Sequence, residues 1–204
     1  MNNKRKKTEL LVATTNKGKM HEMQALLAGS GLEVLNLGNF PKMDEVEEKG
    51  TSFRENAILK AEEYGKHCGL LTLADDSGLE VDILNGEPGI YSARYGGPGK
   101  TDADRNELVL SKVKRYEDHQ LTARFRCVVA IWEPCSNKTQ TFEGTVEGLI
   151  LKELRGEQGF GYDPLFYFPP YGKTLGQVSR SEKEKISHRG QAVRKAVKYI
   201  RTQL

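Results

Sequence analysis

Leu73-Ala74-Asp75-Asp76-Ser77-Gly78-Leu79 connects two apolar runs through two adjacent carboxylates, a hydroxyl and a glycine. The apolar run over residues 69–74 predicts a buried strand, and Asp-Ser-Gly is typical of a tight turn. The alternating residues 79–84 then predict a second, half-buried strand. Two carboxylates at one strand end repel each other, so we expect a positive partner, and a divalent cation is the simplest candidate. The alternative interpretation is a plain turn without a bound ion.

The composition limits the class of protein. A chain of 204 residues forms one domain or a small two-lobed one. Its 37% hydrophobic and 29% charged residues are ordinary for a soluble protein, and a net charge of +3 does not indicate nucleic-acid binding by itself. No apolar run approaches the roughly 20 residues of a membrane-spanning helix, and no secretory signal is recognisable. The three cysteines lack metal-type spacing, which favours reduced thiols and a cytoplasmic location.

The N-terminal part contains a candidate phosphate-binding turn. Residues 1–8 are polar and basic, and we expect a disordered tail there. Residues 9–14 predict a buried strand, and Thr14-Thr15-Asn16-Lys17-Gly18-Lys19 leads from it into a helix expected to begin near Lys19. Such a turn presents backbone N–H groups and a helix N-terminus, which suit phosphate, although the P-loop pattern is absent. Because lysines at a helix start oppose the helix dipole, a bound anion explains them better than helix stability does.

An acidic loop and a capped helix follow. The loop over residues 39–50 carries four carboxylates: Asp44, Glu45, Glu47 and Glu48. Ser52 and Glu55 have the spacing of a capping box, so a helix begins there. Asn56 and Lys60 are one helical turn apart and share a face. Since Asn is a poor helix former, Asn56 indicates a polar role.

The second half predicts a mixed sheet and a final helical segment. Residues 101–116 predict a helix, and residues 122–132 and 140–148 predict an antiparallel hairpin. The sheet is therefore not expected to be purely parallel. The segment 179–204 is helical and basic, with Ser187 as the N-cap of its last helix.

Two stretches near the C-terminus suit a nucleobase. In Gly159-Phe160-Gly161-Tyr162-Asp163-Pro164 the flanking glycines let a base approach Phe160, whose flat ring suits stacking. An aromatic corner that anchors the hairpin is the alternative. His188 and Arg189 lie in the first turn of the last helix, where cations oppose the dipole and an oxygen-rich ligand would offset that cost.

Together these stretches resemble the inosine triphosphate pyrophosphatase family, also called Ham1 or RdgB-like, in their order and spacing from Leu10 to about Ala196. The stretches that carry the resemblance are residues 14–19, 52–57, 74–79 with 88–94, 159–164 and 186–190. The resemblance implies one α/β domain over residues 1–204 with two lobes, a mixed sheet and a nucleotide cleft between the lobes. It also implies a homodimer without a membrane or stable nucleic-acid partner. The implied activity is Mg²⁺-dependent hydrolysis of ITP, dITP and XTP to the monophosphate and pyrophosphate, which cleanses the nucleotide pool.

The resemblance also implies a role for each matching residue. Asp76 is the metal-associated proton acceptor and Glu47 a second metal ligand, although Glu45 or Glu48 beside it could take that role. The implied substrate-binding residues are Thr14, Thr15, Asn16, Lys17, Gly18 and Lys19 for the triphosphate, Ser77, and Phe160, Gly161, Tyr162, Asp163, Lys183, His188 and Arg189 for the base.

Physical chemistry agrees with these roles. Hydrolysis between the α- and β-phosphates needs charge neutralisation and a positioned water. Mg²⁺ is typically held by one or two carboxylates and water, and a neighbouring carboxylate can deprotonate the attacking water. His188 and Arg189 offer donors to the 6-oxo group of hypoxanthine, which the 6-amino group of adenine would leave unpaired.

Two alternatives stay open at this stage. The first is a non-catalytic nucleotide- or RNA-binding module, served by the basic chain ends and Phe160, although Asp75 and Asp76 would repel a phosphate backbone without a metal. The second is an enzyme of the same class that hydrolyses the ordinary dNTPs.

Overall fold

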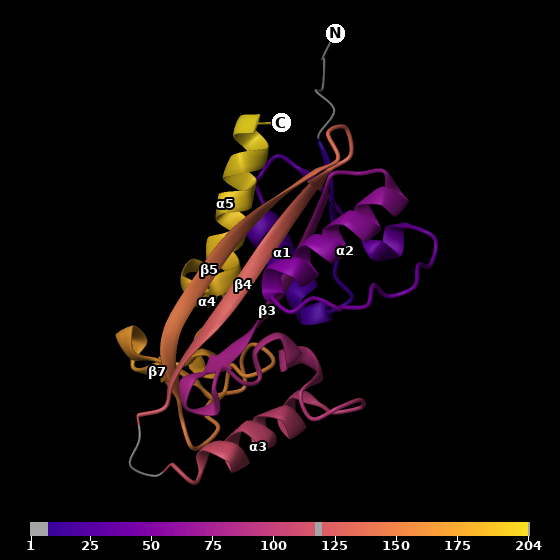
Figure 1. Ribbon diagram of the computed structural model, residues 1–204. Helices are drawn as coiled ribbons and strands as arrows, with labels where there is room; N and C mark the ends of the chain where they lie inside the picture. Colours follow the sequence, from indigo (N-terminus) through magenta and orange to yellow (C-terminus); the bar gives the residue numbers. More distant parts are fainter. Residues whose placement is uncertain (1–7, 117–119, 204) are drawn as a thin grey trace. The chain divides into compact units, whose positions relative to one another are not determined.

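The computed structural model describes residues 8–116 and 120–203, so the predicted basic tail lies outside the described residues except for Thr8 (Figure 1). The helices are α1 (Lys17–Leu27), α2 (Phe53–Cys68), α3 (Asp102–Val113), α4 (Arg180–Ile186) and α5 (His188–Gln203). The strands are β1 (Glu9–Val12), β2 (Glu33–Asn36), β3 (Thr72–Val81), β4 (Thr122–Glu133), β5 (Lys138–Ile150), β6 (Phe166–Phe168) and β7 (Lys173–Thr174). No helix in these described ranges is long and apolar enough to cross a membrane.

The strands form a mixed sheet in the order β2-β1-β3-β4-β5-β6-β7. Strand β1 is parallel to β2 and β3, because α1 and α2 supply the crossovers that parallel neighbours require. Strand β6 is antiparallel to both β5 and β7. The predicted mixed α/β class is therefore confirmed.

The chain divides into two compact units. Unit 1 comprises Met1–Asp76, Val128–Phe142 and Ala192–Leu204, and unit 2 comprises Ser77–Cys127 and Glu143–Gln191. The first boundary between them falls inside β3, at the peptide bond from Asp76 to Ser77.

The prediction of a turn at residues 75–78 is wrong. Strand β3 runs without interruption through this stretch, and the predicted second strand ends at Val81, where a short 3₁₀ helix begins. As whole residues, Asp75 and Asp76 are only 2% and 4% exposed. Local turn propensity did not decide the backbone here because both carboxylates have buried partners from neighbouring helices. Consecutive strand residues point to opposite faces, so the two carboxylates receive different partners.

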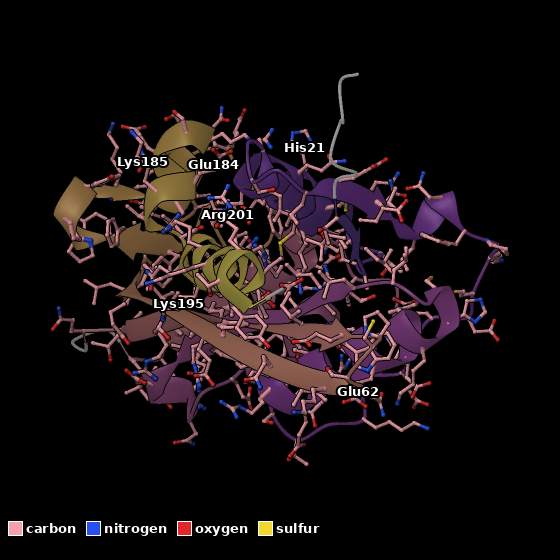
Figure 2. All side chains as sticks on the ribbon, turned by 90° about the horizontal axis from the view of Figure 1, so that it is seen from above. His21, Glu62, Glu184, Lys185, Lys195 and Arg201 are labelled. Atoms are coloured by element: carbon pink, nitrogen blue, oxygen red, sulfur yellow. The ribbon has the colours of Figure 1, made fainter. Side chains whose placement is uncertain are left out.

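Unit 1 packs α1 and α2 against the parallel strands. Strand β1 contributes the buried Leu10, Leu11 and Val12, and α1 contributes Met23 and Leu27. The end of α5 is fixed to the loop after α1, because the Arg201 guanidinium, labelled in Figure 2, donates hydrogen bonds to the carbonyl oxygens of residues 29 and 30.

Helix α2 approaches β4 closely at Gly65. A Cβ atom at this position would lie 2.3 Å from Cε3 of Trp132, which is far inside van der Waals contact. We therefore expect Gly65→Ala to lower the free energy of unfolding by about 1–3 kcal/mol, as overpacking does. The sign of this change in the free energy of unfolding is informative, because Gly→Ala in an exposed helix interior stabilises a protein by roughly 1 kcal/mol. Urea denaturation checks this, with Glu63→Ala on the exposed side of α2 as the control; a stabilised Gly65→Ala variant would contradict the packing.

Unit 2 has its own hydrophobic core. Leu79 and Val81 of β3 pack there with Val109 and Val113 of α3, and further members include Phe125, Leu165 and Phe166. A capping box between Thr101 and Asp104 begins α3 close to the predicted start. The predicted helical segment 179–204 is interrupted at Ser187, whose hydroxyl accepts a hydrogen bond from the Gly190 N–H as α5 begins.

Candidate functional site

The turn after β1 has a fixed geometry. Helix α1 begins at Lys17, two residues before the predicted position, because the Asn16 side chain caps it by accepting from the Lys19 N–H at 3.0 Å. The Thr14 hydroxyl accepts from the Asn16 N–H at 3.2 Å. The Thr15 hydroxyl donates to Glu45 at 2.9 Å, which ties the turn to the acidic loop. The predicted phosphate-binding residues therefore lie together in one ordered turn.

Lys19 and Asp75 form a buried ion pair. The Lys19 ammonium lies 3.2 Å from Oδ2 of Asp75, and the two side chains are 11% and 1% exposed. From the sequence we expected a bound anion to compensate the lysines at the start of α1. For Lys19, the Asp75 carboxylate provides much of that compensation. Lys17, in contrast, is exposed at the start of α1.

Asp76 lies in a polar cluster built by α2 and the acidic loop. The Asn56 amide donates to Oδ2 of Asp76 at 3.0 Å, and the Lys60 ammonium lies 3.8 Å from Oδ1. The same ammonium contacts the carboxylate of Glu48. Asn56 and Lys60 were not predicted as site residues, although their shared helical face was visible in the sequence.

Burial and neighbouring charges shift the pKa values in this cluster. Burial raises the pKa of Asp76 and outweighs the opposite effects of Lys60 and Lys19. Burial acts to lower the pKa of Lys60, but the carboxylates of Asp76, Asp75 and Glu48 outweigh it and raise that pKa. Three carboxylates therefore surround two ammonium groups, which leaves an excess negative charge that favours a further cation.

The structure brings Glu48, and not Glu47, to Asp76. The Glu47 side chain is 75% exposed and pairs with Lys49 at 2.9 Å, whereas the Glu48 side chain is 20% exposed and pairs with Lys60. The sequence of an irregular acidic loop does not reveal which of two adjacent carboxylates points inward. The assignment of Glu47 as a metal ligand is thus not supported by its position.

The Asp76 cluster fits a magnesium ion. Among the described residues no group of three or more His, Cys, Asp and Glu side chains is arranged to hold a metal. Mg²⁺ needs fewer protein ligands, because it is commonly bound by one or two carboxylates together with water and substrate phosphates. The Lys60 ammonium already lies between the carboxylates of Glu48 and Asp76, which shows that this pair attracts positive charge.

In unit 2, two cations face the ring of Phe160. The Lys183 ammonium lies 4.8 Å and the Arg189 guanidinium carbon 5.7 Å from the ring centroid. Arg189 is 2% exposed and donates to the hydroxyl of Ser77 at 2.8 Å. These distances allow cation–π attraction between the ring and both side chains.

Asp163 fixes the loop that carries Phe160. Its Oδ2 accepts from the Phe160 N–H at 2.8 Å and from the Lys183 ammonium at 2.5 Å. Gly159 makes room for this carboxylate, because a Cβ atom there would lie 2.0 Å from the same oxygen. The predicted residues Phe160, Asp163, Lys183 and Arg189 are therefore brought together.

Tyr162 and His188 are anchors in the core of unit 2. The Tyr162 hydroxyl donates to the carbonyl oxygen of Ser92 at 2.9 Å, and burial raises the pKa of Tyr162. The His188 ring stacks on Phe125 with centroids 4.8 Å apart and an interplanar angle of 9°. Both side chains lie within the packed interior, so they support the Phe160 loop rather than offering an open stacking face.

Strand β3 contributes to both units. Asp76 belongs to unit 1, and Ser77, the acceptor of the Arg189 hydrogen bond, belongs to unit 2.

Comparison with known proteins identifies the relatives of this chain. The family model described as "Ham1 family" matches residues 10–199. A dITP/XTP pyrophosphatase from Desulforamulus reducens is 50% identical over 94% of this chain and 95% of its own length. One from Listeria innocua is 45% identical over 94% of both chains. The solved structure of a HAM1 protein from Coxiella burnetii has a TM-score of 0.86 at 39% identity and covers 95% of this chain and 98% of its own.

Proposed function

The chain belongs to the Ham1 family, and from that premise we propose that it hydrolyses the non-canonical purine nucleotides ITP, dITP and XTP to the monophosphate and pyrophosphate. It is a nucleoside-triphosphate pyrophosphatase, and its reaction removes deaminated purines from the nucleotide pool. The observation that supports the chemistry best is the buried Asp76, with Asn56 and Lys60 on its two oxygens.

The polar cluster of unit 1 serves the phosphates. The backbone N–H groups of Lys17 and Gly18 at the start of α1, together with the Lys17 side chain, bind the triphosphate, and Lys60 neutralises part of its charge. The hydrogen bond from Asn56 orients the Asp76 carboxylate. Asp76 accepts the proton of the attacking water, and its raised pKa strengthens it as a base.

A magnesium ion completes the proposal. Glu48 and Asp76 would hold it, and the bound ion would stabilise the negative charge that develops on the phosphate oxygens. The chemistry of the cluster supports this assignment, because two carboxylates and an excess negative charge lie beside the turn that receives the triphosphate.

The Phe160 cluster of unit 2 serves the base. Phe160 stacks on the purine, as aromatic side chains do on nucleobases. The Arg189 guanidinium lies close to the Phe160 ring and is a hydrogen-bond donor only, which suits a 6-oxo group. Adenine presents an amino group at that position and would leave buried donors unpaired, which disfavours ATP. The predicted homodimer and cytoplasmic location stay predictions from the sequence.

Pyrophosphate release tests the proposed function. Purified protein is assayed with ITP, dITP, XTP, ATP, GTP and dTTP, each with Mg²⁺ and with EDTA. We expect rapid release from the first three substrates with Mg²⁺ and little from the others. An equal or higher kcat/KM for dTTP would favour the enzyme of ordinary dNTPs instead. Full activity in EDTA would contradict the magnesium assignment, and no release from ITP, dITP or XTP would overturn the proposed activity.

A further inference from the structure

Helix α3 holds the Phe160 loop through both polar groups of one glycine. The Gly161 N–H donates to Oδ2 of Asp102 at 2.8 Å, and the Gly161 carbonyl accepts from Nδ2 of Asn106 at 2.9 Å. Asp102 and Asn106 are one helical turn apart at the start of α3. Neither residue belongs to the Phe160 cluster itself, and both lie more than 50 residues before Phe160 in the sequence.

These two hydrogen bonds restrain the backbone on either side of Gly161. The N–H belongs to the peptide plane that joins Phe160 to Gly161, and the carbonyl belongs to the plane that joins Gly161 to Tyr162. Gly161 has φ +62°, a conformation that glycine adopts readily but does not enforce. Fixing both planes therefore fixes the direction in which the Phe160 side chain leaves the backbone.

Only one of the two flip orientations of the Asn106 side-chain amide can hold the Gly161 carbonyl. Its Nδ2 group donates to the Gly161 carbonyl and to the Asp102 carbonyl, the latter at 2.8 Å. Its buried Oδ1 atom has no hydrogen-bond partner in the described part of the chain. A flipped amide would place this oxygen against two carbonyl oxygens. Since an unpaired buried acceptor destabilises the fold, the arrangement indicates a role beyond stability.

We propose that Asn106 and Asp102 are positioning residues for nucleobase recognition, which act by holding Gly161 so that Phe160 presents its ring to the purine. This inference rests on the proposed function. The two residues touch neither the phosphate cluster nor Asp76 in the contacts described above. Their loss therefore weakens binding of the base and leaves the hydrolytic step unchanged, which predicts a rise in KM without a matching fall in kcat.

A matched pair of variants tests the proposal. Asp102 and Asp104 are both acids in the first turn of α3, but only Asp102 contacts Gly161, whereas Asp104 caps the helix through Thr101. We expect Asp102→Ala to raise the KM for ITP about threefold or more, with kcat within about twofold of wild type. Asp104→Ala should lower the melting temperature at least as much and leave KM unchanged. The Asp102 side chain is 53% exposed, so the variant is expected to fold.

Asn106→Ala gives the larger effect and a test of mechanism. We expect its KM for ITP to rise about tenfold, the value of one buried hydrogen bond of typical strength. In a Phe160→Ala background the same change should raise KM by less than about twofold, because the side chain that it positions is gone. The proposal would be overturned if Asn106→Ala raised KM by the same factor in the wild type and in the Phe160→Ala variant. A fall in kcat at constant KM would also overturn it.

The outcomes separate this inference from the proposed function. A wild-type protein that releases no pyrophosphate from ITP would remove the proposed function. An active wild type with unchanged KM in Asp102→Ala would remove only the positioning role, and this variant decides the question if Asn106→Ala fails to fold.

Discussion

Replacing Asp76 by Asn is expected to lower kcat for ITP hydrolysis by about 10²- to 10⁴-fold, the range that a general base contributes. The amide is nearly the same size as the carboxylate and can still accept the hydrogen bond from Asn56. It cannot take up a proton from water. Because burial raises the pKa of Asp76, its charged form is costly in the fold, so the neutral amide should not lower the melting temperature.

Glutamine variants in the acidic loop provide the controls. Glu47→Gln changes an exposed residue and should retain wild-type kcat and the wild-type Mg²⁺ requirement. Glu48→Gln, whose side chain faces Lys60, should raise the Mg²⁺ concentration needed for half-maximal activity. Steady-state kinetics and a Mg²⁺ titration measure these effects. Wild-type kcat in Asp76→Asn would refute the assigned base, and a normal Mg²⁺ requirement in Glu48→Gln would refute the assigned ligand.

Lys183→Met is expected to lower the free energy of unfolding by about 3–5 kcal/mol, the usual result of removing one partner of a buried ion pair. The Lys183 and Asp163 side chains are 7% and 3% exposed, and no solvent screens the carboxylate once its ammonium is gone. The Asp163 carboxylate also accepts from the Phe160 N–H. This hydrogen bond keeps the carboxylate from moving to another position after Lys183 is replaced. The melting temperature should fall by roughly 10 °C or more.

Lys185 on the same helix is the matched control. It projects from α4 toward open space in Figure 2 and is exposed. Lys185→Met should change the free energy of unfolding by no more than about 0.5 kcal/mol. Adding Asp163→Asn to Lys183→Met should recover part of the lost stability, because it removes the buried negative charge that has lost the Lys183 ammonium. Equal denaturation midpoints for Lys183→Met and Lys185→Met would show that the buried pair is not important for the fold.

Features that depend on local interactions were predicted well from the sequence. Ser52 is the N-cap of α2 where expected, because its hydroxyl accepts from the Glu55 N–H within one turn. The Glu55 carboxylate accepts from the Thr51 N–H instead of completing the predicted capping box. The stretch at residues 75–78 was misjudged because its local preference is a turn. The partners that keep it extended, Lys19 and Asn56, come from distant parts of the chain.

In the candidate site, too, features that depend on distant parts of the chain could not be predicted from the sequence. The loop residues 159–163 and the cations Lys183 and Arg189 were identified from their composition and from resemblance, and the structure groups them. The choice between Glu47 and Glu48 depends on which way an irregular loop faces, which no local pattern records. Asn106 was invisible because its only relevant feature is one contact with a carbonyl 55 residues away.

The ammonium of Lys60 between Glu48 and Asp76 has a consequence for the protein before any ligand arrives. It is a built-in counter-ion, which holds two acidic groups at close range by partly cancelling their repulsion. The chain can therefore assemble this region during folding without waiting for a metal. A cation bound by these carboxylates would compete with this ammonium for the same oxygens. The Lys60 side chain would then be available to a negatively charged substrate.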